Sequence, residues 1–276
     1  MSDDVSDIAA YYNSDPEREH YRLERHQLEY DLTWRYLDQY LPPQGTVLEV
    51  GAGPGKYTLE LAKRGYTITA VDMSAMLFET CRRNITDAGL DRRVRFIVAD
   101  ARDLSQVTEQ EYDAALLMGP LYHLMEEADR KAALKEVFDR LRGGGILFSS
   151  FISRFGIMGD LLRDIPGWIE DQVEVRSLLE RGKRPDEYPR GGFRGYFALV
   201  SEIAPMHEAL GFETLAVAGV EPAISADDES YNKLEGIQRQ SWLDLLYNIS
   251  TESSIIGASR HLLYVGKKRD DENVAP

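Results

Sequence analysis

The chain has 276 residues, of which 43% are hydrophobic and 29% are charged, a composition typical of a soluble globular protein. The length suits one large domain, or a domain with a substantial cap, around a real hydrophobic core. A net charge of −15 argues against a protein that grips the nucleic-acid backbone, which requires a basic surface. We therefore expect no nucleic-acid partner, unless a local basic patch provides one.

The negative charge is unevenly distributed along the chain. Residues 1–31 carry nine acids and three bases, and residues 221–235 carry five acids and one base. Two thirds of the net charge therefore lies in these two segments, and the rest of the chain is only mildly acidic. If both segments lie near a ligand-binding site, their charge favours neutral or cationic ligands over polyanions.

Several classes of protein are excluded by features that the sequence lacks. Cys81 is the single cysteine, which excludes an internal disulfide and a cysteine-cluster metal site and is typical of a reducing cytosol. The sequence contains no run of 18 apolar residues, so we expect no membrane span. Its acidic N-terminal residues also lack the apolar core of a signal peptide. We expect a cytoplasmic protein, either a monomer or a homodimer, with no membrane partner.

Apolar, β-rich runs alternate with helical patterns over the first half of the chain. A helix is predicted over 17–40, where Tyr21, Leu28 and Leu32 recur at helical spacing, and Pro42-Pro43 ends it. After it, strands are predicted at 46–50, 67–71, 94–98, 112–118 and 146–152, and helices at about 56–64, 74–88 and 128–141. This alternation is typical of a parallel sheet with helices on both faces.

The second half interrupts this pattern and then resumes it. Residues 153–197 form a long connection with three prolines and a mixture of apolar and charged residues. A connection of this length is usually functional or disordered, and we interpret it as a cap over the strand ends. The alternation then continues with helices at about 200–210 and 230–249 and strands at about 212–219 and 259–266.

The most informative segment follows the first strand and reads Val47-Leu48-Glu49-Val50-Gly51-Ala52-Gly53-Pro54-Gly55. In open α/β sheets ligands bind at the carboxyl ends of the strands, where glycines let the backbone pass close to the ligand. A dinucleotide pattern, G-x-G-x-x-G, fails because position 56 is Lys56, and the spacing of a Walker P-loop is also absent. The pattern that remains is acid-x-G-x-G-x-G.

This glycine pattern resembles the class I S-adenosylmethionine (SAM)-dependent methyltransferases. Three further matches follow in the order of that family: Asp72 ends the second strand, Asp100 follows the third, and Met118 to His123 follows the fourth. The resemblance covers residues 45–152 motif by motif and the whole chain more loosely. It looks like the stand-alone methyltransferases of bacterial metabolism and natural-product pathways.

The pattern and the resemblance together predict an α/β fold. We expect a Rossmann-like, seven-stranded, mostly parallel sheet with helices on both faces, and a helical cap inserted after the fifth strand. The expected organisation is an N-terminal helical lid segment (1–44), a cofactor-binding core (45–152), the cap (153–197), and helices and strands that complete the sheet (198–276).

The resemblance also implies SAM as the cofactor and S-adenosylhomocysteine (SAH) as its product. Asp72 would accept hydrogen bonds from both ribose hydroxyls, and Met73 would pack on the adenine. Asp100 would accept from the adenine amine, and the backbone N–H of Ala101 would read a ring nitrogen. Glu49, the acid of the glycine loop, would lie near the methionyl part, and Met118, after the fourth strand, would lie near the reacting methyl. The loop residues expected to contact the cofactor are Gly51, Ala52, Gly53 and Gly55. Taken singly, an aspartate at a strand end is as often a helix N-cap.

The N-terminal segment of similar proteins folds over the cofactor. In this chain Tyr12 could donate to the methionyl carboxylate, and Arg22 could form an ion pair with it. The other interpretation of these residues is an amphipathic helix that packs its aromatic stripe on the sheet.

His123 is the candidate general base. A sulfonium methyl is already activated, so alignment of the acceptor with it provides much of the catalysis, and a base is required only where the acceptor must lose a proton. His123 follows the fourth strand, where the acceptor is expected, although it could also be a packing histidine. The other histidines, His20, His26, His207 and His261, are interpreted as structural.

The acceptor is expected to be a small molecule methylated on oxygen or nitrogen. Methyltransferases that act on base amines typically carry Asn/Asp-Pro-Pro-Tyr/Phe after the fourth strand, whereas this chain reads Met118-Gly119-Pro120-Leu121-Tyr122. The alternatives are an RNA or protein methyltransferase, or a protein that binds SAM without transferring its methyl group. No group of His, Asp and Glu has metal-ligand spacing, so no metal is expected.

Overall fold

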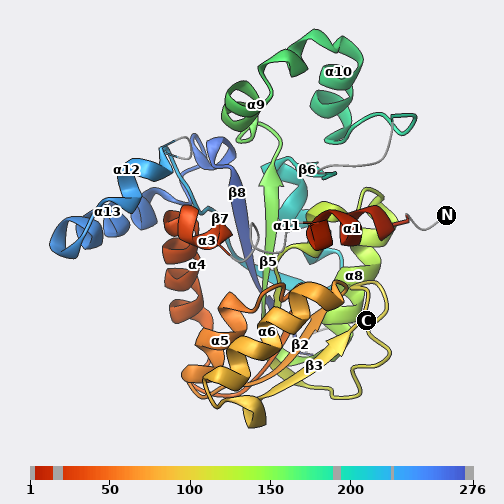
Figure 1. Ribbon diagram of the computed structural model, residues 1–276, viewed down its shortest axis with the longest axis vertical. Helices are drawn as coiled ribbons and strands as arrows, with labels where there is room; N and C mark the ends of the chain where they lie inside the picture. The colour runs from red at the N-terminus through yellow and green to blue at the C-terminus, as the bar shows by residue number, and fades with distance from the viewer. Residues whose placement is uncertain (1–3, 15–20, 189–193, 225–226, 271–276) are drawn as a thin grey trace.

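A computed structural model describes residues 4–14, 21–188, 194–224 and 227–270 of the chain (Figure 1). Its centre is a sheet in the order β3-β2-β1-β4-β5-β8-β7, with the short β6 paired to β5. All neighbouring strands are parallel except β8, which runs antiparallel to β5 and β7. The strands are β1 (Thr46–Val50), β2 (Thr67–Asp72), β3 (Val94–Val98), β4 (Tyr112–Leu117), β5 (Leu141–Ser153), β6 (Phe197–Ala198), β7 (Phe212–Gly219) and β8 (His261–Lys268).

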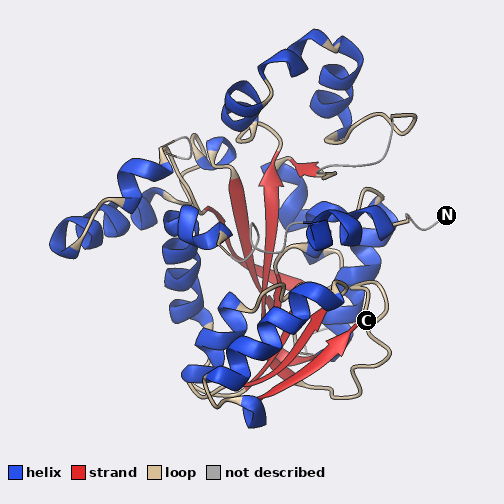
Figure 2. Ribbon diagram, viewed as in Figure 1, coloured by secondary structure: helices blue, strands red, loops and turns tan. Residues whose placement is uncertain are grey.

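Helices cover both faces of the sheet, and Figure 2 separates the two kinds of element by colour. In the first half of the described chain the α-helices are α1 (Ser6–Ser14), α3 (Arg22–Arg25), α4 (Gln27–Tyr40), α5 (Lys56–Lys63), α6 (Ala75–Asp87), α7 (Pro120–His123) and α8 (Glu127–Arg140). The later ones are α9 (Met158–Asp164), α10 (Gln172–Arg181), α11 (Val200–Glu208), α12 (Asp228–Asn232) and α13 (Gly236–Ile249). Short 3₁₀ helices are η1 (Asp91–Arg93), η2 (Pro166–Glu170) and η3 (Ile256–Ala258).

The two faces of the sheet bury two separate apolar cores. Along β4 the side chains alternate between them: Ala114 and Leu116 join the core under α4, α5 and α6, while Ala115 and Leu117 join the core under α8 and α11. All four are completely buried. A strand covered on both faces needs apolar residues at every position, and this explains the continuous apolar runs in the sequence.

The predicted Rossmann-like, mostly parallel sheet is confirmed, with differences at the ends of some elements. The helix expected over 17–40 is interrupted at His26, whose φ of −115° and ψ of 61° are not helical, so that α3 and α4 are separate. The helix expected over 230–249 is likewise interrupted before Gly236, which has a φ of +52°. β5 begins at Leu141 and not at the expected residue 146, and it therefore includes Gly143, Gly144 and Gly145.

Residues 154–188 leave the sheet at the end of β5 and form α9, η2 and α10, at the top of Figure 1. Leu178 of α10 packs in a small apolar core with Ile152 of β5 and Phe197 of β6. Several apolar side chains of residues 154–188 are exposed, including Leu162 and Val173. The role of this segment as a cap over the active site stays a prediction.

The topology brings the functional loops to one edge. The parallel strands β1 to β5 and β7 all end at this edge, and the antiparallel β8 begins there, because Ile152 at the end of β5 pairs with His261. The loops after β1, β2, β3, β4 and β7 and the first residue of β8 are therefore neighbours. Within the described ranges, no helix is both long and apolar enough to cross a membrane.

Gly55 packs against α6 and should be intolerant of any side chain. Its φ is +83°, and a Cβ there would overlap the sulfur of Cys81. Gly65, with a φ of +98°, has nothing within 4 Å of the same position and is the matched control. We expect Gly55→Ala to lower the free energy of unfolding by ~1–3 kcal/mol more than Gly65→Ala, because only Gly55→Ala adds overpacking to left-handed strain. Urea denaturation measures both, and equal losses would contradict the packing argument.

Candidate active site

The loop after β1 passes through three left-handed glycines. Gly51, Gly53 and Gly55 have φ values of +85°, +53° and +83°. A Cβ on Gly51 would lie 2.5 Å from the Cδ atom of Pro120, whereas a Cβ on Gly53 would have no atom within 4 Å. Gly51 is therefore required for packing within the protein, while Gly53 borders open space in which a ligand can approach the backbone.

A cavity lies over this loop and encloses roughly 1340 Å³, counting the space open to solvent. Every predicted site residue except Gly55 lines it, and Gly55 instead caps the start of α5 behind the loop. The lining residues that the sequence predicted are Tyr12, Arg22, Glu49, Gly51, Ala52, Gly53, Asp72, Met73, Asp100, Ala101, Met118 and His123. The fold thus gathers residues from positions 12 to 123 around one hollow at the ends of the strands, where ligands bind in open α/β sheets.

Asp72 is held rigidly at the end of β2. One of its carboxylate oxygens accepts from the backbone N–H of Gly53 at 2.7 Å, and the other accepts from the backbone N–H of Ser74 at 2.8 Å. Because each oxygen has more than one acceptor direction, both can also accept from a cis-diol. The geometry fits the ribose role predicted for Asp72, and it links the glycine loop to β2.

Asp100 lines the cavity and forms an ion pair with Arg102. Arg102 donates to it at 2.6 Å and also reaches Asp129 at 3.0 Å. Burial alone would raise the pKa of Asp100, but the hydrogen bonds from Arg102 hold it below its usual value. Asp100 therefore stays an ionised acceptor, as its predicted contact with the adenine amine requires.

Glu49 is almost completely buried beneath the glycine loop. The hydroxyl of Thr58 donates to its carboxyl group at 2.7 Å. Burial raises the pKa of Glu49 to about 8, since this hydrogen bond offsets the loss of water only in part. At neutral pH the ligand-free protein therefore holds Glu49 largely as the neutral acid, and a cationic ligand group nearby would favour its ionisation.

His123 and Tyr12 form a hydrogen-bonded pair at the end of β4. The Nδ1 atom of His123 lies 3.1 Å from the carbonyl oxygen of Arg194, which can only accept, so the ring proton is on Nδ1. The Nε2 atom then accepts from the Tyr12 hydroxyl at 2.7 Å. Burial lowers the pKa of His123 to about 4, so the ring is neutral at physiological pH. The hydroxyl of Tyr12, predicted to contact the cofactor, is therefore directed at the candidate base.

Helix α1 covers this part of the cavity and is fastened at three points. Besides Tyr12, its Asn13 accepts from the Ser74 hydroxyl at 2.7 Å, and its Asp7 pairs with Arg194 at 2.8 Å. These contacts hold α1 beside the cavity, and its role as a lid stays a prediction.

Arg22 lines the cavity with its guanidinium paired to a carboxylate of the protein. Two of its nitrogens donate to Glu29 at 2.7 and 2.9 Å. Burial alone would raise the pKa of Glu29, but Arg22 and His261 bring it down to about 2. The predicted pairing of Arg22 with a ligand carboxylate would therefore add a second anion to an arginine that already has one.

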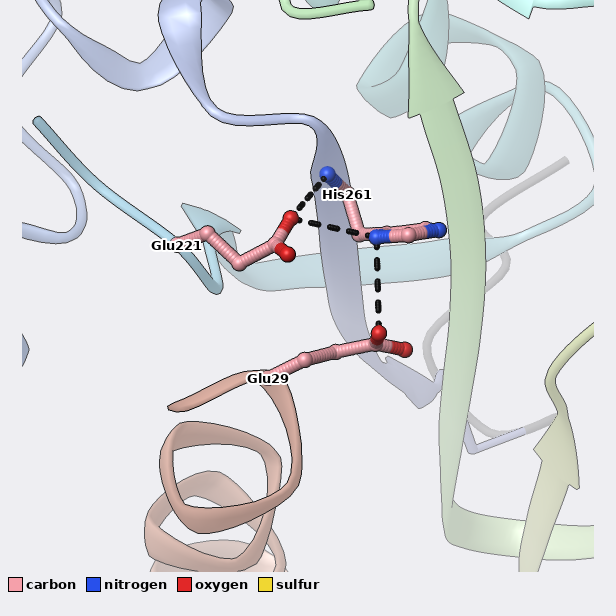
Figure 3. A group of neighbouring side chains, drawn as sticks. All are labelled: Glu29, Glu221 and His261. Carbon is pink, nitrogen blue, oxygen red and sulfur yellow. Dashed lines mark hydrogen bonds and ion pairs between the residues drawn. The ribbon is translucent and has the colours of Figure 1, made fainter. Parts of the chain in front are cut away.

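His261 is a cavity residue that the sequence analysis interpreted as structural. Its Nδ1 atom lies 3.1 Å from Glu221 and 3.4 Å from Glu29, and Figure 3 shows both carboxylates at this side of the ring. The missed signal was the direction of the last strand, because an antiparallel β8 brings its first residue to the ligand-binding edge. Of the other histidines, His207 is buried between Ser149 and Ile203, as expected of a structural residue, and His20 lies outside the described part of the chain.

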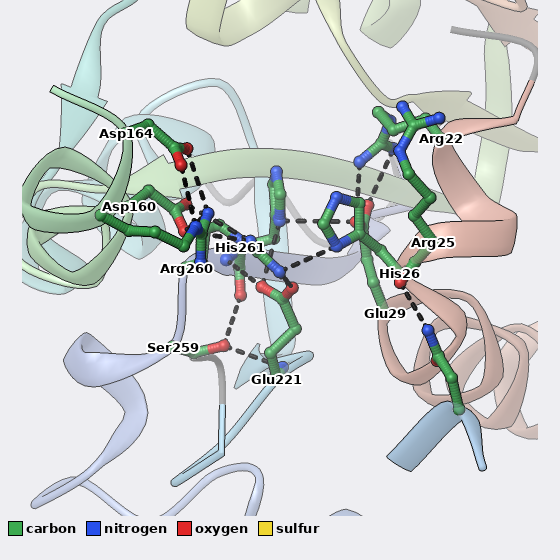
Figure 4. Close-up of polar contacts among 12 residues, drawn as sticks. Arg22, Arg25, His26, Glu29, Asp160, Asp164, Glu221, Ser259, Arg260 and His261 are labelled. Atoms are coloured by element: carbon green, nitrogen blue, oxygen red, sulfur yellow. Dashed lines mark hydrogen bonds and ion pairs between the residues drawn. The ribbon is translucent and has the colours of Figure 1, made fainter. Parts of the chain in front are cut away.

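Figure 4 shows the wider charge network around His261. Arg260 pairs with Glu221 and with Asp160, the latter at 3.2 Å, and it also contacts the Nδ1 atom of His26 at 3.0 Å. Glu29, Glu221 and His261 lie close enough together to hold a metal ion. However, a guanidinium group already pairs with each of the two carboxylates, so their charge is balanced without one.

Residues 47–145 match the family model described as "Methyltransferase domain". The matched part of the chain is therefore a methyltransferase domain, with the fold of the class I SAM-dependent enzymes. The matched range runs from β1 into β5 and contains the glycine loop, Asp72, Asp100 and His123. SAM is thus the cofactor, and the enzyme is a methyltransferase, as the sequence predicted.

Individual relatives share less than a third of their aligned residues with this chain. The tRNA 5-carboxymethoxyuridine methyltransferase of Escherichia coli is 27% identical over 209 residues, which cover 72% of this chain and 73% of that protein. The carboxy-S-adenosyl-L-methionine synthase of Aliivibrio salmonicida is 31% identical over 163 residues, which cover 54% and 66%. The solved 1,6-didemethyltoxoflavin-N1-methyltransferase of Burkholderia thailandensis, with bound SAH, shares the fold with a TM-score of 0.58, 18% identity and coverage of 96% and 87%.

The expectation that this methyltransferase has no nucleic-acid partner was wrong. A relative that matches almost three quarters of the chain is named for a tRNA nucleoside. The physical error was to use the net charge of the whole chain, because phosphate contacts depend on the local distribution of charge.

We expect Asp72→Asn to lower the affinity for SAH by ~1–3 kcal/mol, the range for hydrogen bonds to a charged acceptor. The amide retains one oxygen, which can keep one of the two backbone contacts, but it cannot accept at both atoms. Isothermal titration calorimetry measures the change, and Asp139→Asn on the exposed side of α8 is the control. Unchanged affinity would contradict the ribose role.

The buried acid Glu49 should make stability depend on pH. Its folded pKa of about 8 lies above the value of 4.5 expected when unfolded, so the folded state binds more protons between these values. The contribution of Glu49 to stability is therefore present below pH 4.5 and is lost as the pH rises through 8. In urea denaturation of the ligand-free protein, Glu49→Gln should flatten the decline in stability between pH 5 and pH 8; an unaltered slope would contradict this assignment.

Proposed function

We propose that this methyltransferase transfers the methyl group of SAM to an oxygen or nitrogen atom of a compact acceptor group that binds beside the ends of β4, β5 and β8. The observation that carries the proposal is the extent of the cavity. It continues beyond the predicted cofactor residues to Tyr122, Ser150 and His261, none of which belongs to a cofactor motif. This extension offers the acceptor a partly enclosed place next to the residues that follow β4.

Bound SAM supplies an electrophilic methyl group, and the residues of the chain supply alignment. Gly53 leaves open space at the loop, and Asp72 is fixed by two backbone N–H groups, so the cofactor position is defined before the acceptor enters. Much of the rate then comes from holding the acceptor at attack distance.

The Tyr12–His123 pair is the proposed acceptor of a proton. Neutral His123 accepts the hydrogen bond of the Tyr12 hydroxyl, so a proton that leaves the acceptor can pass to the tyrosine oxygen while the tyrosine proton passes to Nε2. Because the pKa of His123 is about 4, the ring is in its proton-accepting form throughout the neutral range. The carbonyl of Arg194 keeps the Nδ1 proton in place and so orients the ring.

Two sources of the acceptor group have support. The enclosed cavity is compatible with a free small molecule, as the sequence suggested. The tRNA methyltransferase relative supports a modified nucleoside carried on tRNA, which would have to leave the base stack to reach the cavity.

A transfer assay with methyl-labelled SAM separates these sources. Bulk bacterial tRNA and a low-molecular-mass metabolite extract are offered in parallel, and the label is followed into the nucleic acid or into the small-molecule fraction. We expect transfer to one of them, abolished by Asp72→Asn at limiting SAM. Absence of transfer to both, in protein that binds SAH by calorimetry, would contradict the proposal.

The proton role predicts a specific kinetic pattern once label transfer is observed. Tyr12→Phe and His123→Asn should each lower the rate by about 10²-fold or more, with little change in the affinity for SAH. The wild-type rate should decline on the acidic side only as the pH falls toward about 4, where His123 becomes protonated. Rates and pH profiles that the two substitutions leave unchanged would exclude the pair from proton transfer.

A further inference from the structure

The end of the cavity over β5 and β8 combines positive charge with apolar walls. Arg22 and His261 line it together with Val220, Leu262 and Leu263, and so does Glu29, which is paired with Arg22. Both cationic side chains are mostly buried, with 25% of the Arg22 side chain and 13% of the His261 side chain exposed. Positive charge held in a desolvated space acts more strongly on a ligand than the same charge on an open surface.

The ring of His261 has a fixed orientation. Its Nδ1 edge faces Glu221 and Glu29, and its backbone N–H also donates to Glu221 at 2.9 Å. The Nε2 atom lies on the opposite side of the ring (Figure 3), and among the described residues no hydrogen bond to it is found. Since His261 lines the cavity, this nitrogen is its group available to a ligand.

The surroundings of His261 favour the protonated ring. Burial alone would lower its pKa, but Glu29 and Glu221 together raise it above the usual value. An imidazolium donates from both nitrogens, so the carboxylates bind the Nδ1–H and the Nε2–H remains for the cavity. The arginines of the network, Arg22 and Arg260, would repel a metal ion from the same carboxylates.

We propose that His261, with Arg22 beside it, forms a subsite that binds a carboxylate group of a ligand. A carboxylate would accept a charge-assisted hydrogen bond from Nε2–H and would be attracted by the guanidinium of Arg22. The apolar walls of the cavity would contact the rest of the ligand. Glu29 and Glu221 act as positioning residues that orient the ring and keep its charge.

Two molecules could supply this carboxylate. One is the methyl acceptor. The position of β8 in the sheet favours this source, because β4 and β5 lie between β8 and β1, whose end carries the glycine loop. The other is the cofactor, through its methionyl carboxylate. The acceptor source rests on the function proposed above, whereas direct binding measurements test the subsite without any turnover.

The first experiment compares SAH with 5′-methylthioadenosine, which lacks the amino-acid part, by calorimetry. The variants are His261→Asn, whose amide can replace the Nδ1–H but not the Nε2–H, and His261→Gln, whose longer amide can place an N–H toward the cavity. If the cofactor supplies the carboxylate, His261→Asn lowers SAH affinity by about tenfold or more and leaves 5′-methylthioadenosine binding unchanged. His261→Gln should then recover part of the loss.

The second experiment titrates SAH-saturated protein with phenoxyacetate and with its neutral amide, phenoxyacetamide. If the acceptor supplies the carboxylate, the wild type prefers phenoxyacetate by about tenfold, His261→Asn removes this preference, and SAH affinity stays unchanged. Thermal unfolding verifies that each variant is folded. Should His261→Asn not fold, Glu221→Gln serves instead, because it leaves the ring in place and weakens its charge, and the same losses are expected in smaller measure.

Three results would overturn the subsite. The first is an unchanged SAH affinity in His261→Asn together with no wild-type preference for phenoxyacetate. The second is an equal loss of SAH and 5′-methylthioadenosine binding, which would make His261 a structural residue only. The third is stoichiometric binding of Zn²⁺ or Mn²⁺ by the wild type that His261→Asn abolishes, since the cluster would then be a metal site.

Discussion

Buried negative charge at the carboxyl edge of the sheet determines how the two ends of this chain are joined. Glu29 near the start of α4 and Glu221 after β7 are both buried, and an isolated ionised carboxylate in such a place would be strongly destabilising. Arg22, Arg260 and His261 supply the compensating charge. Since breaking such a pair leaves an uncompensated charge, with a typical loss of about 3–5 kcal/mol, the network holds α3 and α4 against the start of β8.

The part of the fold that depends on local pattern was predictable from sequence. The apolar runs at β1, β2 and β3 and the acid-x-G-x-G-x-G loop determine the sheet and the ligand edge, because period and glycine placement are local properties. The break at His26 was not predictable, since it depends on tertiary contacts such as that between His26 and Arg260. The two-residue strand β6 also gave no signal, because a pattern of period two cannot be seen in two residues.

The same distinction applies to the site. Gly53, Asp72 and Asp100 were found because each follows a strand that can be recognised, and His123 was found by its place after β4. His261 was missed because its position depends on the antiparallel direction of β8, which a run of apolar residues does not reveal. The sequence also could not show that Tyr12 meets His123, because these residues are 111 positions apart and only the fold of α1 over the cavity brings them together.

The packing of Gly55 against Cys81 provides a chemical reporter inside the molecule. Cys81 is the single cysteine of the chain, it is completely buried, and burial raises its pKa to about 12, so its thiol is nearly unreactive in the folded state. A thiol-selective reagent can modify it only when α6 separates from the glycine loop. The rate of alkylation therefore reports on local opening of the loop that holds SAM, at one defined atom and without introducing any label into the protein.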